Sequence, residues 1–326
     1  MQQRFDRIPQ LALLWSIAIL VGLGSGRCLS NDQSAVSVPR AVPPEVALAE
    51  VLPAEVLAAS TAEAELRRFK PQALQSLWAT TGGLITGRDD LSLSFMEVGL
   101  GTGIPLGSFD NVVAIRPRFR VDWLDAPESF DLPSQLYDFE LQFAYRRVLN
   151  ERLSLLGVFS PSARSDLTTS EDAFRMFGLG LINWQWIPDR LTISFGAVAL
   201  GRADLPVLPA MGVQWTPTRR TRLELRFPES RFAYRMAKDG RRSEVWLYSS
   251  VGLGGNTWAV TRSSGLADEL SLRDYRLHLG IERLVDGGGR CFAELGAALG
   301  RRLEYERNPL ELQLGDAFSL RAGWRY

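Results

Sequence analysis

Apolar and polar residues alternate along most of the chain beyond Gly87. The clearest example is "VVAIRPRFRVDW", residues 112–123, where charged side chains recur at every second position. One face of an extended chain there carries Val113, Ile115, Pro117, Phe119, Val121 and Trp123, and the other carries Arg116, Arg118, Arg120 and Asp122. A helix would scatter these residues around its axis, so the pattern predicts a β-strand with one apolar and one ionic face.

The neighbouring stretch "LYDFELQFAYRR", residues 136–147, repeats the pattern, with Asp138 and Glu140 on its polar face. If the two strands pair with Arg120 opposite Asp138, then Arg118 lies opposite Glu140. The loop between the two strands leaves this register open. Together the stretches predict antiparallel strands whose ionic faces adjoin.

The connections between such strands are of two kinds. Tight connections fall at 148–152, 187–190, 216–220 and 286–290, and long ones at 124–134, 160–171, 201–207, 262–271 and 304–316. Short turns at one end and long loops at the other are typical of an up-and-down transmembrane β-barrel. We therefore predict an all-β fold, a transmembrane antiparallel barrel of about 12 strands.

Aromatic residues cluster near both ends of the expected strands, as the two girdles of a membrane barrel would require. Trp184, Trp186 and Trp215 precede tight turns, whereas Trp123 and Tyr137 flank a long loop. The alternative is a soluble β-sandwich in which large aromatic side chains fill the core.

The chain ends inside a strand, "FSLRAGWRY". Its apolar side carries Phe318, Leu320, Trp324 and Tyr326, and no polar tail follows. An unpaired edge of this kind recruits other chains, so we expect the last strand to pair with the first and close the barrel. The aromatic end resembles the C-terminal signal of outer-membrane barrels, and this resemblance implies the barrel-assembly machinery and outer-membrane lipids as partners.

The N-terminal region has a different composition. Arg4 and Arg7 precede an apolar run from Leu11 to Leu23, which is typical of a secretory signal, with an uncleaved membrane anchor as the alternative. We expect a signal peptide at 1–30, an Ala/Pro-rich linker, partly disordered or helical, at 31–85, and an outer-membrane β-barrel at 86–326, exported by the N-terminal signal.

Candidate chemistry is sparse. The formal net charge is zero and lysine occurs only at Lys70 and Lys238, so no nucleic-acid-binding stripe is expected. With two cysteines and one histidine, we expect no metal site and no cofactor. His278 lies on the polar face of "YRLHLGIE", where it could serve a hydrolase with a serine or an acid, but no partner has a recognisable spacing. We expect no enzyme and no catalytic residue.

The charged faces should point into the barrel, where charges must pair or contact water. We expect the lumen to be lined by Arg116, Arg118, Arg120, Asp138, Glu140, Arg222, Glu224, Arg276, His278, Glu282 and Arg321. These residues either neutralise one another and fill the barrel, or line a path for a small solute. A barrel of this size lies between the filled eight-stranded and the open sixteen-stranded types, so size alone does not distinguish a filled barrel from a solute path.

One segment carries a family resemblance. "LPAMGVQWTPTRRTRLELRFPESRFAYRM", residues 208–236, resembles a bacterial domain-of-unknown-function family of predicted outer-membrane β-barrels. The resemblance extends over roughly residues 85–326 and implies a location and a shape, but no catalytic residue, ligand or cofactor. Three hypotheses for function follow: a narrow channel for small solutes or ions, a non-conducting structural or surface-interaction barrel, and an outer-membrane hydrolase.

Overall fold

The computed structural model of the chain describes residues 66, 73–87, 89–199, 207–307 and 311–326. These residues form fifteen strands and one short 3-10 helix, η2 (Glu128–Phe130). The strands are β1 (Leu74–Ile85), β2 (Ser92–Pro105), β3 (Asn111–Asp125), β4 (Gln135–Val148), β5 (Leu153–Ser165), β6 (Phe174–Ile187), β7 (Leu191–Ala199), β8 (Leu208–Thr218), β9 (Thr221–Arg226), β10 (Glu229–Asp239), β11 (Ser243–Thr261), β12 (Ala267–Val285), β13 (Gly289–Tyr305), β14 (Glu311–Gln313) and β15 (Ala317–Arg325). No helix among the described residues is long and apolar enough to cross a membrane.

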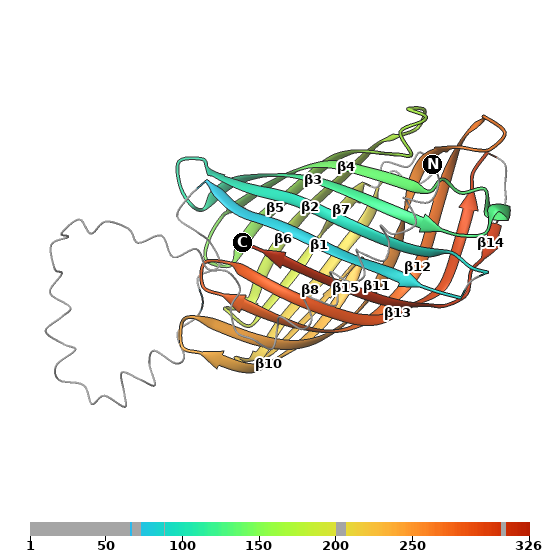
Figure 1. Cartoon of the computed structure of the whole chain (residues 1–326). Coiled ribbons are helices and arrows are strands. Elements are labelled where there is room, and N and C mark those ends of the chain that lie inside the picture. Colours follow the sequence, from blue (N-terminus) through green and yellow to red (C-terminus); the bar gives the residue numbers. More distant parts are fainter. Residues whose placement is uncertain (1–65, 67–72, 88, 200–206, 308–310) are drawn as a thin grey trace, which may run out of the picture.

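The strands close into an antiparallel barrel (Figure 1). Neighbours in sequence pair from β1 to β13, and β15 pairs with both β13 and β1, so fourteen strands form the wall. The three-residue strand β14 adds a short extra ladder to β13. The all-β barrel and the pairing of the last strand with the first are confirmed, and the predicted number of about 12 strands is close to fourteen.

The strand number differs from the prediction for two reasons. The segment 220–261 holds the three strands β9, β10 and β11. In addition, residues 74–85, which the sequence interpretation assigned to the linker, form β1 and pair with β2 and β15. Small and polar residues on both faces of "LQSLWATTGGLI" hide its alternation. The expected signal peptide and the rest of the expected linker lie outside the described residues, apart from Leu66 and Ala73.

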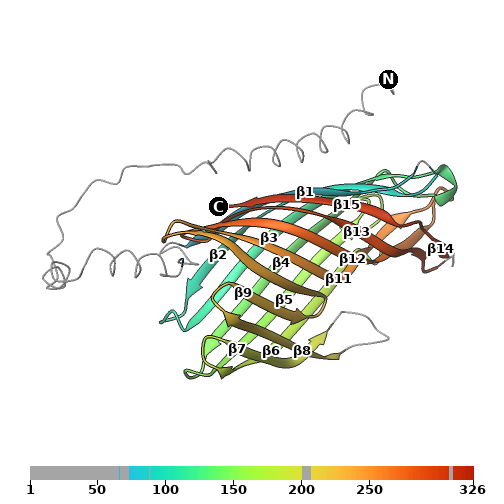
Figure 2. The same ribbon diagram turned by 90° about the horizontal axis from the view of Figure 1, so that it is seen from below.

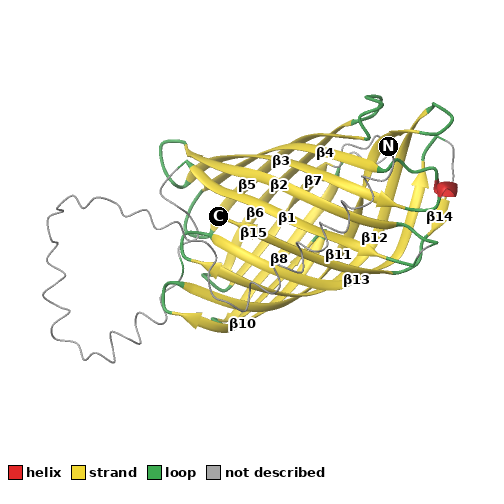
Figure 3. Cartoon of the chain, in the orientation of Figure 1, coloured by secondary structure: helices red, strands yellow, loops and turns green. Residues whose placement is uncertain are grey.

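The two ends of the barrel differ, as Figure 3 shows. One end, the turn side, carries the connections 106–110, 149–152, 188–190, 219–220, 240–242 and 286–288. The other end, the loop side, carries longer segments, among them 126–134 with η2, 166–173 and the region of β14. The predicted alternation of tight turns and long loops is therefore present, although the β9–β10 connection on the loop side has only residues 227–228.

The outer face of the wall is apolar. Leu277 on β12 is 52% exposed and Met211 on β8 is 76% exposed. Similar exposed side chains are Phe139, Leu141, Phe159, Met176, Ile182, Phe195, Phe232, Leu247, Leu279, Ile281, Leu295 and Phe318. Such a surface cannot face water over the whole circumference, so it is a lipid-facing belt.

The β3–β4 register is the one that the sequence allowed. Arg118 pairs with Glu140 and Arg120 with Asp138 across the ladder. Because Phe139 and Leu141 on the same strand are exposed to lipid, alternation turns Asp138 and Glu140 into the barrel.

The barrel narrows toward the loop side. The ladder between β10 and β11 ends at Glu229 and Gly252, but β11 continues to Thr261 and there meets β5, with Ala259 opposite Ser165 in a parallel bridge. Figure 2 shows β11, β12 and β13 running on toward β14 beyond β8 and β9. The strands β1–β5, β11–β13 and β15 thus enclose a nine-strand section above the fourteen-strand section.

A bend across three neighbouring strands makes this narrowing possible. Gly255 on β11 has φ of +101°, and a Cβ there would collide with the backbone of Leu272. At the same level, two residues of β13, Gly300 and Arg301, oppose the single residue Asp274 of β12, which is a β-bulge. The left-handed φ of Gly255 requires glycine and redirects β11 toward β5.

The interior of the nine-strand section is a packed apolar core, which we call the loop-side core. Leu91, Leu136, Leu270 and Leu303 are all 0% exposed within it. Its other buried members are Leu84, Leu93, Phe95, Trp258, Val260, Leu272, Ala298, Tyr305, Leu314 and Ala317. Inward side chains and loop residues therefore fill the barrel at this end.

Candidate functional site

The inner face of the fourteen-strand section carries an ionic network centred on Arg118. Its guanidinium is 3.0 Å from Glu97, 3.0 Å from Asp138 and 2.6 Å from Glu140. Arg164 on β5 joins the same carboxylates, at 3.3 Å from Asp138. Asp138 is only 1% exposed, so the two guanidinium groups supply the charge that its burial requires.

The other predicted residues on these strands are placed in two ways. Arg120 bonds to Asp122 of its own strand at 2.6 Å and stacks over Phe95 at 4.0 Å, rather than contacting Asp138. Arg116 is exposed and reaches Gln142 at 3.4 Å. The sequence therefore predicted the shared face and, in the register it allowed, the meeting of Arg118 with Glu140, but not the partner of Arg120.

A second ionic cluster covers the wall from β10 to β15. Glu282 forms ion pairs with Arg231 at 2.5 Å and with Arg290 at 2.7 Å. Glu294 accepts Tyr248 and Arg321, each at 2.5 Å. Each carboxylate meets one partner on an adjoining strand and one partner two strands away, so the arginine-rich inner faces neutralise themselves locally.

The remaining predicted residues are not brought into one site. The guanidinium of Arg222 lies over the Trp246 ring at 5.0 Å, and Glu224 pairs with Arg226 of its own strand. Arg276 bonds to Asp274 at 2.7 Å.

His278 is buried, and its Nε2 lies 2.9 Å from Ser319 Oγ. Among the described residues no carboxylate is hydrogen-bonded to this histidine, so the pair lacks the orienting acid of a catalytic triad. Among the described residues no group of three or more acidic, histidine or cysteine side chains could hold a metal ion.

The strands β5–β7 present a different inner face, which the sequence analysis missed. Arg164 on β5 and Arg175 on β6 point into the barrel, where Arg175 reaches Glu269 at 2.5 Å. Because side chains alternate along a strand, the uncharged residues at every second position from these arginines also face inward. We call these residues the neutral wall: Leu156, Val158, Phe177, Leu179 and Leu181. These side chains are half-buried and belong to neither packed cluster. Apolar residues occupy both faces of these strands, so no alternation marks the inner one.

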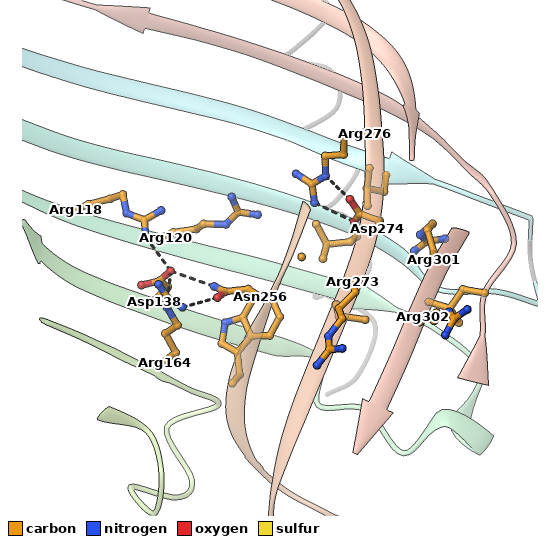
Figure 4. Close-up of a pocket in the computed structure, with 16 residues that line it drawn as sticks. Arg118, Arg120, Asp138, Arg164, Asn256, Arg273, Asp274, Arg276, Arg301 and Arg302 are labelled. Atoms are coloured by element: carbon orange, nitrogen blue, oxygen red, sulfur yellow. Dashed lines mark hydrogen bonds and ion pairs between the residues drawn. The ribbon is translucent and has the colours of Figure 1, made fainter. Parts of the chain in front are cut away.

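A cavity of about 220 Å³ separates the loop-side core from the Arg118 network (Figure 4). Its polar boundary includes Arg118, Arg120, Asp138, Arg164, Asn256, Asp274, Arg276 and Arg301, and its apolar boundary includes Leu84, Leu93, Trp258, Leu272 and Leu314. Figure 4 shows Asn256 of β11 directed at Asp138 and Arg164. Arg164 donates to Asn256 Oδ1 at 2.6 Å, so this contact joins β5 and β11 next to their junction at Ser165 and Ala259.

Loop-side contacts hold the narrowed end together. At the β5–β11 junction, Asp166 Oδ2 accepts the Thr261 backbone N–H at 2.8 Å, and Asp166 Oδ1 accepts that of Thr168 at 2.9 Å. Burial alone would raise the pKa of the Asp166 carboxyl, but these hydrogen bonds lower it below its usual value.

The β3–β4 loop is fastened to the same end of the barrel. Arg262 bonds to Asp131 at 2.6 Å, and this bond holds the pKa of Asp131 below its usual value. Tyr305 Oη donates to the Asp131 carbonyl at 2.7 Å. Bonds from three separate segments therefore converge over the loop-side core.

A closed antiparallel sheet with an apolar belt outside and charges inside defines a transmembrane β-barrel of the outer-membrane class. Residues 126–283 match the family described as Domain of unknown function (DUF6268). The predicted resemblance to a domain-of-unknown-function family is thus confirmed, over a shorter segment than 85–326. A comparison with curated proteins found no match.

Solved outer-membrane proteins show distant similarity. The deltaS2 mutant of the TodX monoaromatic hydrocarbon channel has 10% identity and a TM-score of 0.41, over 79% of this chain and 90% of that chain. Pseudomonas aeruginosa OccD3 (OpdP) has 10% identity and a TM-score of 0.29, over 82% of this chain and 93% of that one. The β domain of the Bordetella autotransporter BrkA has 13% identity and a TM-score of 0.27, over 78% and 99%. Similarity at this level assigns no function to the present barrel.

Proposed function

We propose that this protein is a narrow outer-membrane channel for small solutes or ions, whose lumen is constricted at the loop side. The neutral wall is the observation that carries the proposal. Its apolar side chains are half-buried although they point into the barrel, so side chains do not fill the lumen beside them. A fourteen-strand ring is wider than the eight-stranded barrels that side chains fill.

The charged residues shape the path through this lumen. Arg118 and its three carboxylates project from β2–β4 toward the cavity, opposite Asn256 of β11. Rings of fixed charges select among solutes by electrostatic attraction and by the cost of desolvation. A solute in this lumen therefore moves between charged residues and the neutral wall.

The loop-side core favours a second candidate, a non-conducting structural or surface-interaction barrel. Four leucines of this core are fully buried, and they lie across the axial path. In the channel proposal this end must open or be bypassed. In the structural proposal it stays closed.

Reconstitution into a planar bilayer separates the two candidates. We expect discrete conductance steps, altered in ion selectivity by Arg118→Ala, while Arg307→Ala serves as a matched control because that side chain is partly exposed, does not line the cavity and pairs with Glu171 at 2.8 Å. Heat-modifiable gel migration first shows that each variant is folded. Absence of steps in folded wild-type protein contradicts the channel and supports the structural barrel.

Export and assembly complete the proposal. Residues 1–30 direct the chain out of the cytoplasm, and the barrel-assembly machinery recognises the last strand through Phe318, Leu320, Trp324 and Tyr326. Trp324 pairs with Ala79 of β1, and the pairing of β15 with β1 closes the wall. Recognition of β15 would come before this closing step, which supports the role. The serine double variant at Trp324 and Tyr326 should be exported but not inserted, as membrane fractionation would show, and normal insertion would contradict the role.

A further inference from the structure

We propose that the cavity below the loop-side core binds a small uncharged solute with an apolar body and an amide or hydroxyl group. This inference deepens the proposed channel by naming its solute class, but it rests on the cavity and not on conduction. At about 220 Å³ the cavity is smaller than the sites that hold drug-sized ligands. A short-chain molecule is the appropriate size.

The cavity has two chemically distinct boundaries. Leu84, Leu93, Leu272 and Leu314 of the loop-side core form one of them. The other consists of paired arginine and aspartate side chains. An apolar body against the leucines and a polar group toward the ion pairs would match both boundaries.

Most of the charges around the cavity are already paired, which argues against a charged solute; the exception, Arg301, is 4.0 Å from Asp90 and is held by backbone carbonyls. Arg118 and Arg164 share Asp138, Arg120 bonds to Asp122, and Arg276 bonds to Asp274. An anion would have to separate a guanidinium from its carboxylate, and a cation would have to do the reverse. Breaking a buried pair in this way leaves an uncompensated charge, which is costly.

Three buried polar atoms of residues that line the cavity lack a hydrogen-bond partner among the described residues. They are Nε1 of Trp258, a residue only 2% exposed, Oδ1 of Asp138, and Nε of Arg164, which is in an ion pair with Asp138 Oδ2 at 3.3 Å. The indole N–H is a donor and the Asp138 oxygen an acceptor. An amide or a hydroxyl can accept from one such atom and donate to the other, whereas a hydrocarbon can do neither.

Arg301 bounds the cavity without competing for the solute. Its guanidinium donates to the carbonyls of Leu91 at 2.7 Å and Gly315 at 3.1 Å. These bonds engage a side chain that is only 3% exposed. The unpartnered indole N–H is therefore the stronger attachment point for a solute.

Equilibrium dialysis of the detergent-solubilised barrel tests the inference with three probes of matched length: valeramide, valerate and pentylamine. Protein-free micelles give the background for each probe. We expect saturable binding of valeramide that is at least about tenfold tighter than that of the two ions, because either ion must break an existing pair. No saturable binding above the micelle background, or equal binding of valerate, would overturn the proposal.

Two variants locate the site. Trp258→Phe keeps an aromatic ring and removes the N–H, so it should weaken valeramide binding by about fivefold, whereas Trp215→Phe on the exposed outer face should leave it unchanged. Leu93→Trp should fill the cavity and abolish binding in protein that remains heat-modifiable. An unchanged affinity in both cavity variants contradicts this site. Binding without conductance would overturn the channel proposal alone.

Discussion

The nine-strand section is built from nine of the strands of the fourteen-strand section, yet the two interiors have opposite chemistry. In the narrow section Leu136, Leu270 and Leu303 meet across the ring and exclude water. In the wide section the inner face carries ion pairs on one side and half-buried leucines on the other. The comparison teaches that ring size decides whether inward side chains become a core or a lining.

The largest expected effect is in the wide section. Arg118→Ala should lower the free energy of unfolding by about 3–5 kcal/mol, because Asp138 would remain buried with fewer positive partners. Urea unfolding in lipid vesicles measures the change, and Arg302→Ala at the half-exposed Glu311 pair provides the control. A loss no larger than the control's would show that Asp138 is hydrated, and the wide section would then be wetter than its burial indicates.

A slightly smaller effect is expected in the narrow section. Leu270→Ala should cost about 2–5 kcal/mol of unfolding free energy, since it removes a fully buried side chain from a packed core. The same truncation at Leu277, seven residues further along β12 on its lipid-facing side, should lower the free energy of unfolding by less, because lipid can fill the space. Equal losses at the two positions would mean that the loop-side core is loosely packed.

The β5–β11 junction joins the two sections, and weakening it should have a moderate effect. Asp166→Ala removes the acceptor for the Thr261 and Thr168 backbone N–H groups. We expect this loss to lower the free energy of unfolding by about 1 kcal/mol, because the site is partly exposed. If the junction restricts the path, the open fraction in bilayer recordings should rise by about fivefold. Unchanged gating in a folded variant would place the restriction in the core alone.

Acidification should loosen the loop side by the smallest amount. The carboxyl groups of Asp131 and Asp166 have pKa values below their usual range, through the Arg262 bond and the backbone N–H bonds respectively. A lowered pKa stabilises the fold above the unfolded-state value of about 3.9, and this stabilisation is lost as the pH falls through the folded-state value. Hydrogen exchange, corrected for intrinsic rates, should show residues 126–134 and 262–266 better protected at pH 6 than at pH 3. Equal protection would contradict a role for these carboxylates.

The sequence predicted those parts of the fold that depend on local alternation. "VVAIRPRFRVDW" and "LYDFELQ" showed their two faces directly, and the register of Arg118 with Glu140 was among those they allowed. Closure by the last described strand also followed from local pattern, because the open edge of an apolar strand needs a partner.

The site was less predictable because it depends on contacts between distant segments. Ala259 meets Ser165 across five intervening strands, and no local pattern specifies that contact. The neutral wall escaped notice because "LSLLGVF" is apolar on both faces. Trp258 was not a candidate, because only the tertiary structure shows that this residue lines a cavity and that its N–H has no acceptor among the described residues.

The β-bulge at Gly300 and Arg301 changes which residues of β13 face the interior. Before the bulge, even-numbered residues such as Glu294 and Ala298 face inward, and after it odd-numbered residues such as Leu303 and Tyr305 do so. Deletion of Gly300 would place Arg301 alone opposite Asp274, remove the bulge and leave Leu303 and Tyr305 facing inward. If residue 300 were instead retained in a regular ladder, alternation would bring Arg302 and Glu304 into the leucine core and turn Leu303 outward, so this one extra residue determines which half of the later strand faces the interior.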